Sequence, residues 1–153
     1  MIRKYMSSDL NAVVGIFTLA VHAIGSNYYS PEEIEAWAPS QPDMAMWERY
    51  LNEHYTLVMD SACGIIGFGC LNADGSTMDK LFTHPAHQNE GVGSSIMKAL
   101  EKEATKRGVK EIMLITSDNA RKFHEKRNYV YHHSEKMPWN NLMFDCHFLC
   151  KTL

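Results

Sequence analysis

Residues Pro85 to Met97 read Pro-Ala-His-Gln-Asn-Glu-Gly-Val-Gly-Ser-Ser-Ile-Met, and this stretch decides more about the fold than any other. The segment before it, Met78 to His84, is typical of a β-strand that ends at the proline. The residues after Gly91 carry apolar side chains at helical spacing. A glycine turn between a strand and a helix exposes free backbone N–H groups at the positive end of the helix dipole. The stretch therefore predicts an anion site, of the kind that binds a pyrophosphate.

The spacing of the glycines distinguishes this loop from two common phosphate-binding motifs. No Lys-Ser or Lys-Thr pair follows the last glycine, and the third glycine of a dinucleotide fingerprint is absent. Instead, Gln88-x-x-Gly91-x-Gly93 follows the run from Leu81 to Pro85, and it resembles motif A of the GCN5-related N-acetyltransferases (GNAT), Q/R-x-x-G-x-G/A. In that family the loop amides bind the pyrophosphate of acetyl-coenzyme A (acetyl-CoA). The alternative is a glycine turn that only caps a helix.

A second resemblance to the same family lies in the segment from Asn119 to Tyr129. It is similar to the element N-x-x-A-x-x-F-Y-x-K-x-G-F, although Ala120 directly follows the asparagine. His124 stands where many members have tyrosine, and Asn128 replaces the glycine, a position where asparagine can adopt a left-handed turn. The resemblance implies that Asn119 hydrogen-bonds the pantetheine arm and that Phe123 packs beside the arm or beneath the sheet.

The first motif also implies how the backbone would hold the cofactor. Backbone groups of Leu81, Phe82 and Thr83 would pair with the pantetheine arm, and the amide of Phe82 would face the thioester carbonyl. The diphosphate would rest on the amides of Gln88, Asn89, Glu90, Gly91, Val92, Gly93 and Ser94.

The rest of the chain alternates between expected strands and helices. Strands are expected at residues 2–5, 55–59, 64–72, 76–83, 111–116, 129–132 and 143–149, and helices at 10–24 (capped by Ser7 or Ser8), 31–38, 44–51, 91–107 and 119–126. Ser30-Pro31-Glu32-Glu33 is a capping box, and Asp74-Gly75 is a hairpin turn. We expect one α/β domain over residues 1–153. The resemblance implies the GNAT fold, a mixed six- to seven-stranded sheet flanked by helices, with the cofactor where two parallel strands splay apart.

Composition excludes several functional classes. The 153 residues are 45% hydrophobic with a net charge of −3, which suits a compact enzyme and argues against nucleic acid as a partner. No targeting signal is visible and the apolar run at 12–25 is too short to span a bilayer, so we expect a cytoplasmic protein without a membrane partner. The four cysteines are expected to be small buried residues. No metal is expected, because the family uses none; a homodimer is left open.

The reaction implied is transfer of an acetyl group from acetyl-CoA to a primary amine of a small molecule. Asp79, at the strand parity of Leu81 and Thr83, is the candidate base, with a substrate anchor or a solvated carboxylate as alternatives. His124 is the candidate acid for the departing thiolate; alternatively, a neutral imidazole hydrogen-bonds the sulfur, or the residue is a surface histidine.

Aromatic residues near the helix expected at residues 31–38 are candidates for the acceptor pocket. The segment from Tyr28 to Trp37 resembles the equivalent element of the YafP-like bacterial subgroup of the family. Tyr28, Tyr29 and Trp37 could form an aromatic wall there, or could simply be core. Two other functions stay open: a non-catalytic acyl-CoA-binding sensor module and a nucleotide-binding regulatory domain.

Overall fold

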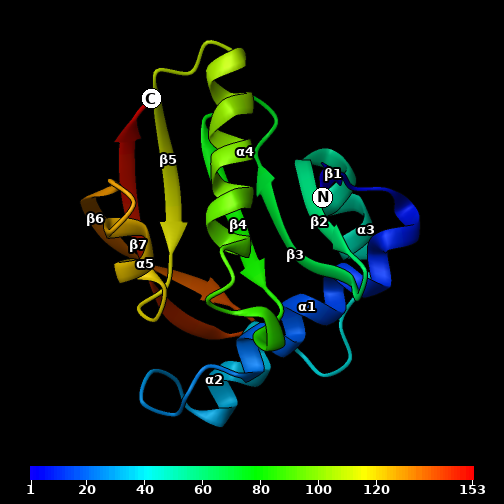
Figure 1. The fold of residues 1–153 in the computed structure, drawn as a ribbon. Helices are drawn as coiled ribbons and strands as arrows, with labels where there is room; N and C mark the ends of the chain where they lie inside the picture. The colour runs from blue at the N-terminus through cyan, green and yellow to red at the C-terminus, as the bar shows by residue number, and fades with distance from the viewer.

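The computed structural model describes all 153 residues and is built on one mixed seven-stranded sheet (Figure 1). Its strands are β1 (Ile2–Lys4), β2 (Tyr55–Ser61), β3 (Gly64–Leu71), β4 (Thr77–Thr83), β5 (Glu111–Thr116), β6 (Val130–Trp139) and β7 (Leu142–Thr152), in the spatial order β1-β2-β3-β4-β5-β7-β6. The helices are α1 (Leu10–His22), α2 (Pro31–Trp37), α3 (Met44–Glu53), α4 (Val92–Lys106) and α5 (Arg121–Glu125), with short 3-10 turns η1 (Ser7–Asp9) and η2 (Pro85–His87). Only β4 and β5 pair in parallel. The expected mixed α/β fold is confirmed.

Helices cover both faces of the sheet. On one face α4 packs against β2, β3 and β4, and its Ile96 and Leu100 are fully buried. The close approach depends on glycine: a Cβ at Gly67 would lie 2.6 Å from a Val92 methyl group, and one at Gly69 would lie 2.9 Å from Ile96. On the other face α1 packs against β3 and β4, and α3 against β2. Helix α4, which follows the predicted anion-binding loop, therefore packs directly on the central strands.

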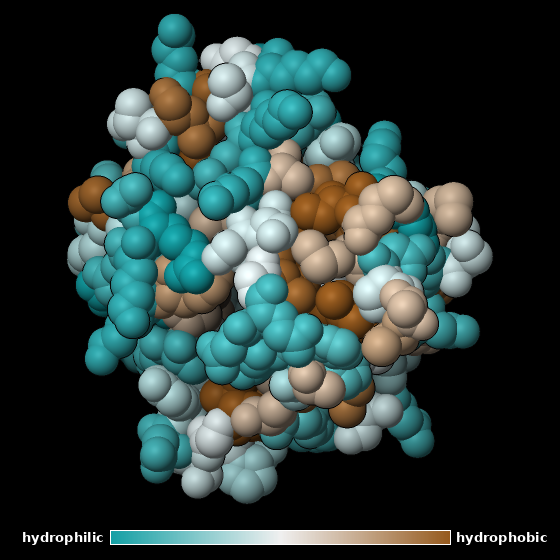
Figure 2. All heavy atoms as spheres, viewed as in Figure 1, coloured by the Kyte–Doolittle hydropathy of each residue, from teal (hydrophilic) through white to brown (hydrophobic).

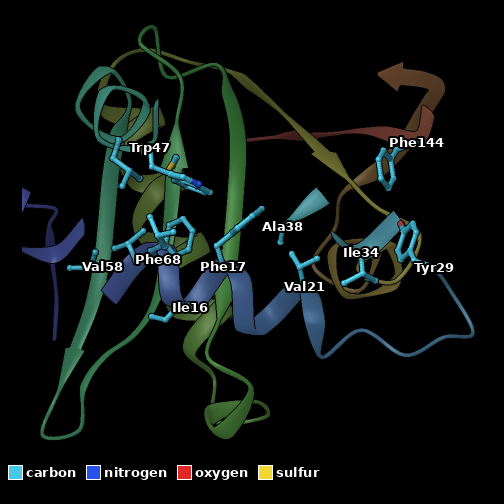
Figure 3. Packing of buried hydrophobic residues seen from close by; sticks show 14 residues of the cluster. Ile16, Phe17, Val21, Tyr29, Ile34, Ala38, Trp47, Val58, Phe68 and Phe144 are labelled. Carbon is cyan, nitrogen blue, oxygen red and sulfur yellow. The ribbon is translucent and has the colours of Figure 1, made fainter. Parts of the chain in front are cut away.

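Aromatic side chains join the second face to the rest of the molecule (Figure 3). Phe17 of α1 contacts Trp47 of α3 and Phe82 of β4, with ring centroids 4.8 and 5.0 Å apart. Further along the same cluster, the ring centroid of Tyr29 lies 6.1 Å from that of Phe144 in β7. These contacts link segments far apart in the sequence, so the region from α1 to α3 becomes one wall beside β4 and β7.

The parallel pair β4–β5 is joined over only two residues of each strand. Thr77 pairs with Met113 and Met78 with Leu114, and beyond these pairs the strands separate (Figure 1). The edge of β4 from Asp79 onward therefore has no partner strand on the β5 side. This is the splay that the family resemblance implied.

Several local expectations were wrong at element boundaries. Neither Ser7 nor Ser8 caps α1; the chain enters through η1, where the buried Asp9 pairs with Arg3 at 2.8 Å. The helix expected at 119–126 is only α5, Arg121–Glu125. The last two strands form a much longer hairpin than expected, and its β6 is exposed over most of its length. Cys63 lies exposed in the β2–β3 turn rather than in the core.

The surface shown in Figure 2 is mostly hydrophilic, with smaller groups of hydrophobic side chains between the polar ones. None of the helices has the length and apolar character needed to cross a membrane.

Candidate active site

The splay between β4 and β5 opens into a cavity of about 700 Å³ that contains almost all of the predicted site residues. β4 contributes residues 79–83 to its wall, the loop before α4 contributes Gln88, Asn89 and Gly91, and the segment around α5 contributes Asn119, Phe123 and His124. The aromatic candidates near α2 line it too. Glu90 does not: its exposed carboxylate turns to His87 instead, with 3.2 Å between Oε1 and Nδ1.

The loop before α4 presents a row of free backbone donors. From residue 88 to residue 94, none of the seven N–H groups donates a well-formed hydrogen bond within the protein. The first such bond of the helix is donated by Ser95, to the carbonyl of Gly91 at 3.0 Å. Asn89 and Gly91 both have left-handed backbone, with φ of 62° and 81°. Successive amides in such a turn converge on one point, which makes a binding site for an anion.

Arg127 holds this loop in place and was not among the residues predicted from sequence. Its Nε donates to Ser94 Oγ at 2.8 Å, and a terminal nitrogen donates to the carbonyl of Phe123, also at 2.8 Å. The guanidinium carbon lies 3.5 Å from the centroid of the Phe123 ring. That ring in turn packs against Gly93, where a Cβ would lie 3.2 Å from it. α5 is thereby fastened to the first turn of α4.

The register of β4 decides which of its amides face the splay. His84 donates to the carbonyl of Ile66 in β3 at 2.8 Å. Because hydrogen-bonding direction alternates along an antiparallel strand, the amide of Phe82 also points to β3. The amides of Leu81 and Thr83 point the other way, into the splay. The expectation that the Phe82 amide faces the thioester is therefore corrected in favour of its two neighbours.

Strand parity predicted that Asp79 shares a face of β4 with Leu81 and Thr83, but in the structure it does not. Cys70 pairs with Lys80 but Leu71 pairs with Met78, so Asp79 is the extra residue of a β-bulge. The bulge reverses the alternation, and Met78 falls on the α4 side together with Leu81. Asp79 turns toward α3 instead, a reversal that sequence parity alone does not reveal.

The carboxylate of Asp79 is held by Tyr50 of α3 and by His54, the C-terminal cap residue of that helix. It accepts a hydrogen bond from the hydroxyl of Tyr50, and His54 Nε2 lies 3.6 Å away. The two rings stack at 3.8 Å, and His54 Nδ1 is 2.8 Å from the Tyr50 carbonyl. Burial raises the pKa of Tyr50 well above its usual range, so the tyrosine stays a donor. Asp79 is thus oriented at the cavity wall while remaining about one-third exposed.

His124 is buried against the sheet rather than exposed on a helix surface. Its ring packs edge-on to Phe123 and Tyr129, and its Nδ1 has no hydrogen-bond partner. Burial, assisted by the positive charge of Arg127, lowers the pKa of His124 to about 4. The imidazole is therefore neutral at cellular pH. The role of a protonated acid, which assumed an ordinary pKa, is corrected; a neutral hydrogen-bond donor remains.

The lowered pKa of His124 predicts a specific loss of stability in acid. The folded-state pKa lies below the unfolded value of about 6.5, so the unfolded chain binds more protons between about pH 6.5 and 4. The free energy of unfolding should fall over that interval, by about 3 kcal/mol in all from this residue. We expect denaturant unfolding at several pH values to show a shallower decline for His124→Phe than for the parent. Parallel curves would contradict the burial of a neutral histidine.

The aromatic candidates form part of the cavity wall. Tyr29 is buried, its hydroxyl accepts from the amide of Asp118 at 3.3 Å, and its ring packs on Trp37 at 5.5 Å. Tyr28 is half-exposed. Trp139, from the end of β6, adds an aromatic ring that the sequence patterns did not indicate. Tyr29 is both core and cavity wall, so the two interpretations offered for it are compatible.

Comparison with known proteins gives one consistent result. Residues 26–143 match the family model described as an acetyltransferase (GNAT) domain. The chain is 30% identical over 128 residues to the N-acetyltransferase YafP of Escherichia coli K12, covering 84% of this chain and 79% of that protein. A GCN5-related N-acetyltransferase from Rhodopseudomonas palustris has a similar structure, with a TM-score of 0.95, 29% identity, and 100% and 95% of the two chains covered. The structure of YncA of Salmonella typhimurium with its cofactor acetyl-CoA has the same fold, with a TM-score of 0.74, 18% identity, and 100% and 93% of the two chains covered.

Proposed function

Because this chain belongs to the GNAT acetyltransferases, we propose that it transfers the acetyl group of acetyl-CoA to a primary amine of a small molecule, by direct attack in a ternary complex. The observation that carries the proposal is the row of free amides at residues 88–94, beside the unpaired edge of β4 and within one cavity. That the Salmonella relative was solved with acetyl-CoA supports the choice of cosubstrate. Since all seven strands join one sheet, we treat residues 1–153 as one acetyltransferase domain.

The chain offers separate groups for the two ends of acetyl-CoA. The amides of residues 88–94 would receive the diphosphate oxygens, and the dipole of α4 adds to the attraction. The amides of Leu81 and Thr83 would pair with the pantetheine arm and the thioester carbonyl, as an added strand pairs with a sheet edge. Asn119 Oδ1 accepts a hydrogen bond from Ser117 Oγ at 2.6 Å, which leaves the amide nitrogen of Asn119 as a donor to the arm.

The chemical step needs a neutral amine, a polarised carbonyl and an exit for the thiolate. Asp79 would take a proton from the incoming ammonium, directly or through water. The amine nitrogen then bonds to the acetyl carbon and loses its second proton to solvent, and the carbon–sulfur bond breaks after an amide of β4 has stabilised the oxyanion. His124, neutral in the folded chain, would donate a hydrogen bond to the departing sulfur, while solvent supplies the proton.

Thiol release from acetyl-CoA over a panel of primary amines tests the proposal. Amine-dependent release is expected, whereas tight acetyl-CoA binding without release by any amine would favour the sensor module instead. Competition separates the third candidate: free coenzyme A should displace bound acetyl-CoA, and ATP and NAD should not. Displacement by all three would indicate a general nucleotide site.

The neutral His124 predicts the shape of the rate profile at alkaline pH. Because its pKa is about 4, no fall in turnover between neutral and alkaline pH should come from its deprotonation. We expect the parent and His124→Phe to differ in rate by a constant factor over that range, at saturating acetyl-CoA. A fall in turnover at alkaline pH that is present in the parent and absent from the variant would show that His124 acts as a protonated acid.

A further inference from the structure

Lys80 is a half-buried cation in the wall of the cavity, surrounded by aromatic rings. Its Nζ lies 4.8 Å from the ring centroid of Tyr50, 5.5 Å from Trp47, 5.6 Å from Phe17 and 6.0 Å from Trp139. The faces of aromatic rings attract a cation without neutralising its charge. The ammonium therefore lies among ring faces, in a place from which water is partly excluded.

The ammonium of Lys80 has no anionic partner in the protein. No carboxylate oxygen lies within 4.0 Å of Nζ, and Nζ donates no hydrogen bond. Two lysines do form ion pairs, Lys136 with Asp145 at 2.9 Å and Lys151 with Glu101 at 3.0 Å, but Lys80 is the lysine that lines the cavity. The neighbouring Asp79 directs its carboxylate to Tyr50 and His54 instead. Three N–H donors of a charged group thus remain available to a molecule in the cavity.

The bulge at Asp79 places this lysine beside the candidate base. Because the bulge reverses the alternation of β4, Asp79 and Lys80 both turn toward α3, one to the Tyr50 hydroxyl and the other to the Tyr50 ring. The carboxylate of Asp79 and the ammonium of Lys80 therefore line the same cavity from consecutive positions. An acceptor with an amine at one point and an anion at another would complement both.

We infer that the acceptor carries an anionic group, a carboxylate or a phosphate-type group, and that Lys80 binds it and so determines specificity. This rests on the proposed function and deepens it. Polyamines and aminoglycosides, which carry only cations, would place a positive charge beside Lys80 and are disfavoured. Amines that also carry a carboxylate, as amino acids do, would complement both the negative charge of Asp79 and the positive charge of Lys80.

Matched acceptors test the inference. 4-(Aminomethyl)benzoate, its carboxamide and the corresponding phenylphosphonate share a shape and keep the amine distant from the variable group; L-phenylalanine and L-phenylalaninamide form a second pair. We expect kcat/KM to favour the anionic member by about tenfold or more, the range of a hydrogen bond to a charged group. Comparison of benzoate and phosphonate identifies which anion is preferred.

Variants then assign the preference to one side chain. Lys80→Met should abolish the preference for the anion while leaving acetyl-CoA affinity unchanged, and Lys80→Arg should keep part of it. Lys4→Met is the matched control, because Lys4 also lies over a ring, 5.3 Å from the centroid of Tyr55, but outside the cavity. An anion preference that survives in Lys80→Met, or equal rates for acid and amide in the parent, would overturn the inference.

Equilibrium binding separates this inference from the proposed function. The acetylated products of the benzoate and the benzamide can be titrated calorimetrically into the chain saturated with coenzyme A. If no amine releases thiol, the proposed catalysis fails, but tighter binding of the acid that Lys80→Met removes would still support the anion site. Where no amine reacts, equal or absent binding of both products would refute it.

Discussion

Gly91→Val is expected to lower the affinity for acetyl-CoA by about a hundredfold or more, in a chain that still folds. Gly91 has a φ of 81°, a conformation that costs an L-residue about 1–2 kcal/mol and a β-branched one more. The open space around its Cα means that no clash adds to this cost. The turn would relax to a different conformation, and the amides of residues 88–94 would no longer converge. Losing two hydrogen bonds to a charged diphosphate, at about 1.5–3 kcal/mol each, accounts for the expected loss.

Gly108→Val supplies a matched control at the other end of the same helix. Gly108 has a φ of 84° and equally open surroundings, but it follows the C-terminus of α4, outside the cavity. Both variants should lose similar stability in denaturant unfolding, whereas calorimetry should show weak acetyl-CoA binding only for Gly91→Val. Equal acetyl-CoA affinities in the two variants would show that the loop before α4 does not bind the diphosphate.

Asp79→Asn is expected to reduce turnover by about 10²-fold or more, with little change in acetyl-CoA affinity. An asparagine oxygen can still accept from the Tyr50 hydroxyl, so the side chain should stay in place while losing its basicity. The acidic limb of the rate profile should change as well. A higher KM for the amine with unchanged turnover would make Asp79 an anchor for the ammonium instead of the base.

Asp145→Asn is the control for a general effect of charge in the cavity. Asp145 lines the same cavity from β7, and its carboxylate is paired with Lys136 at the surface. Its substitution removes one negative charge from the cavity wall and leaves Asp79 unchanged. A comparable loss of turnover in both variants would show that the net charge of the cavity matters more than a base at position 79.

Local sequence signals predicted the features that depend on backbone chemistry. The capping box forms as expected, with Ser30 Oγ accepting from the Glu33 amide at 3.1 Å and Glu33 accepting from the Ser30 amide at 2.9 Å. The glycine turn at Gly91 and the following α4 were likewise predicted, because turn glycines and helical spacing act within a few residues.

Features that depend on contacts between distant segments could not be predicted in the same way. The bulge at Asp79 appears only in the pairing of β4 with β3, and it reversed the assigned face of the candidate base. The low pKa of His124 arises because α5 packs the ring against Phe123 and Tyr129. The aromatic surroundings of Lys80 come from three separate elements, α1, α3 and β6. The exposed β6 gave no apolar alternation, so most of its length was missed.

Amide chemical shifts during a titration with coenzyme A test the proposed diphosphate site. In the proposed complex the diphosphate lies on the backbone N–H groups of residues 88–94, which donate no well-formed hydrogen bond in the protein alone. In a 15N-labelled sample these seven amides should show the largest shifts, saturating with one binding constant, and the amides of Leu81 and Thr83 should shift with them. Saturable binding that leaves residues 88–94 unperturbed would contradict the proposed site.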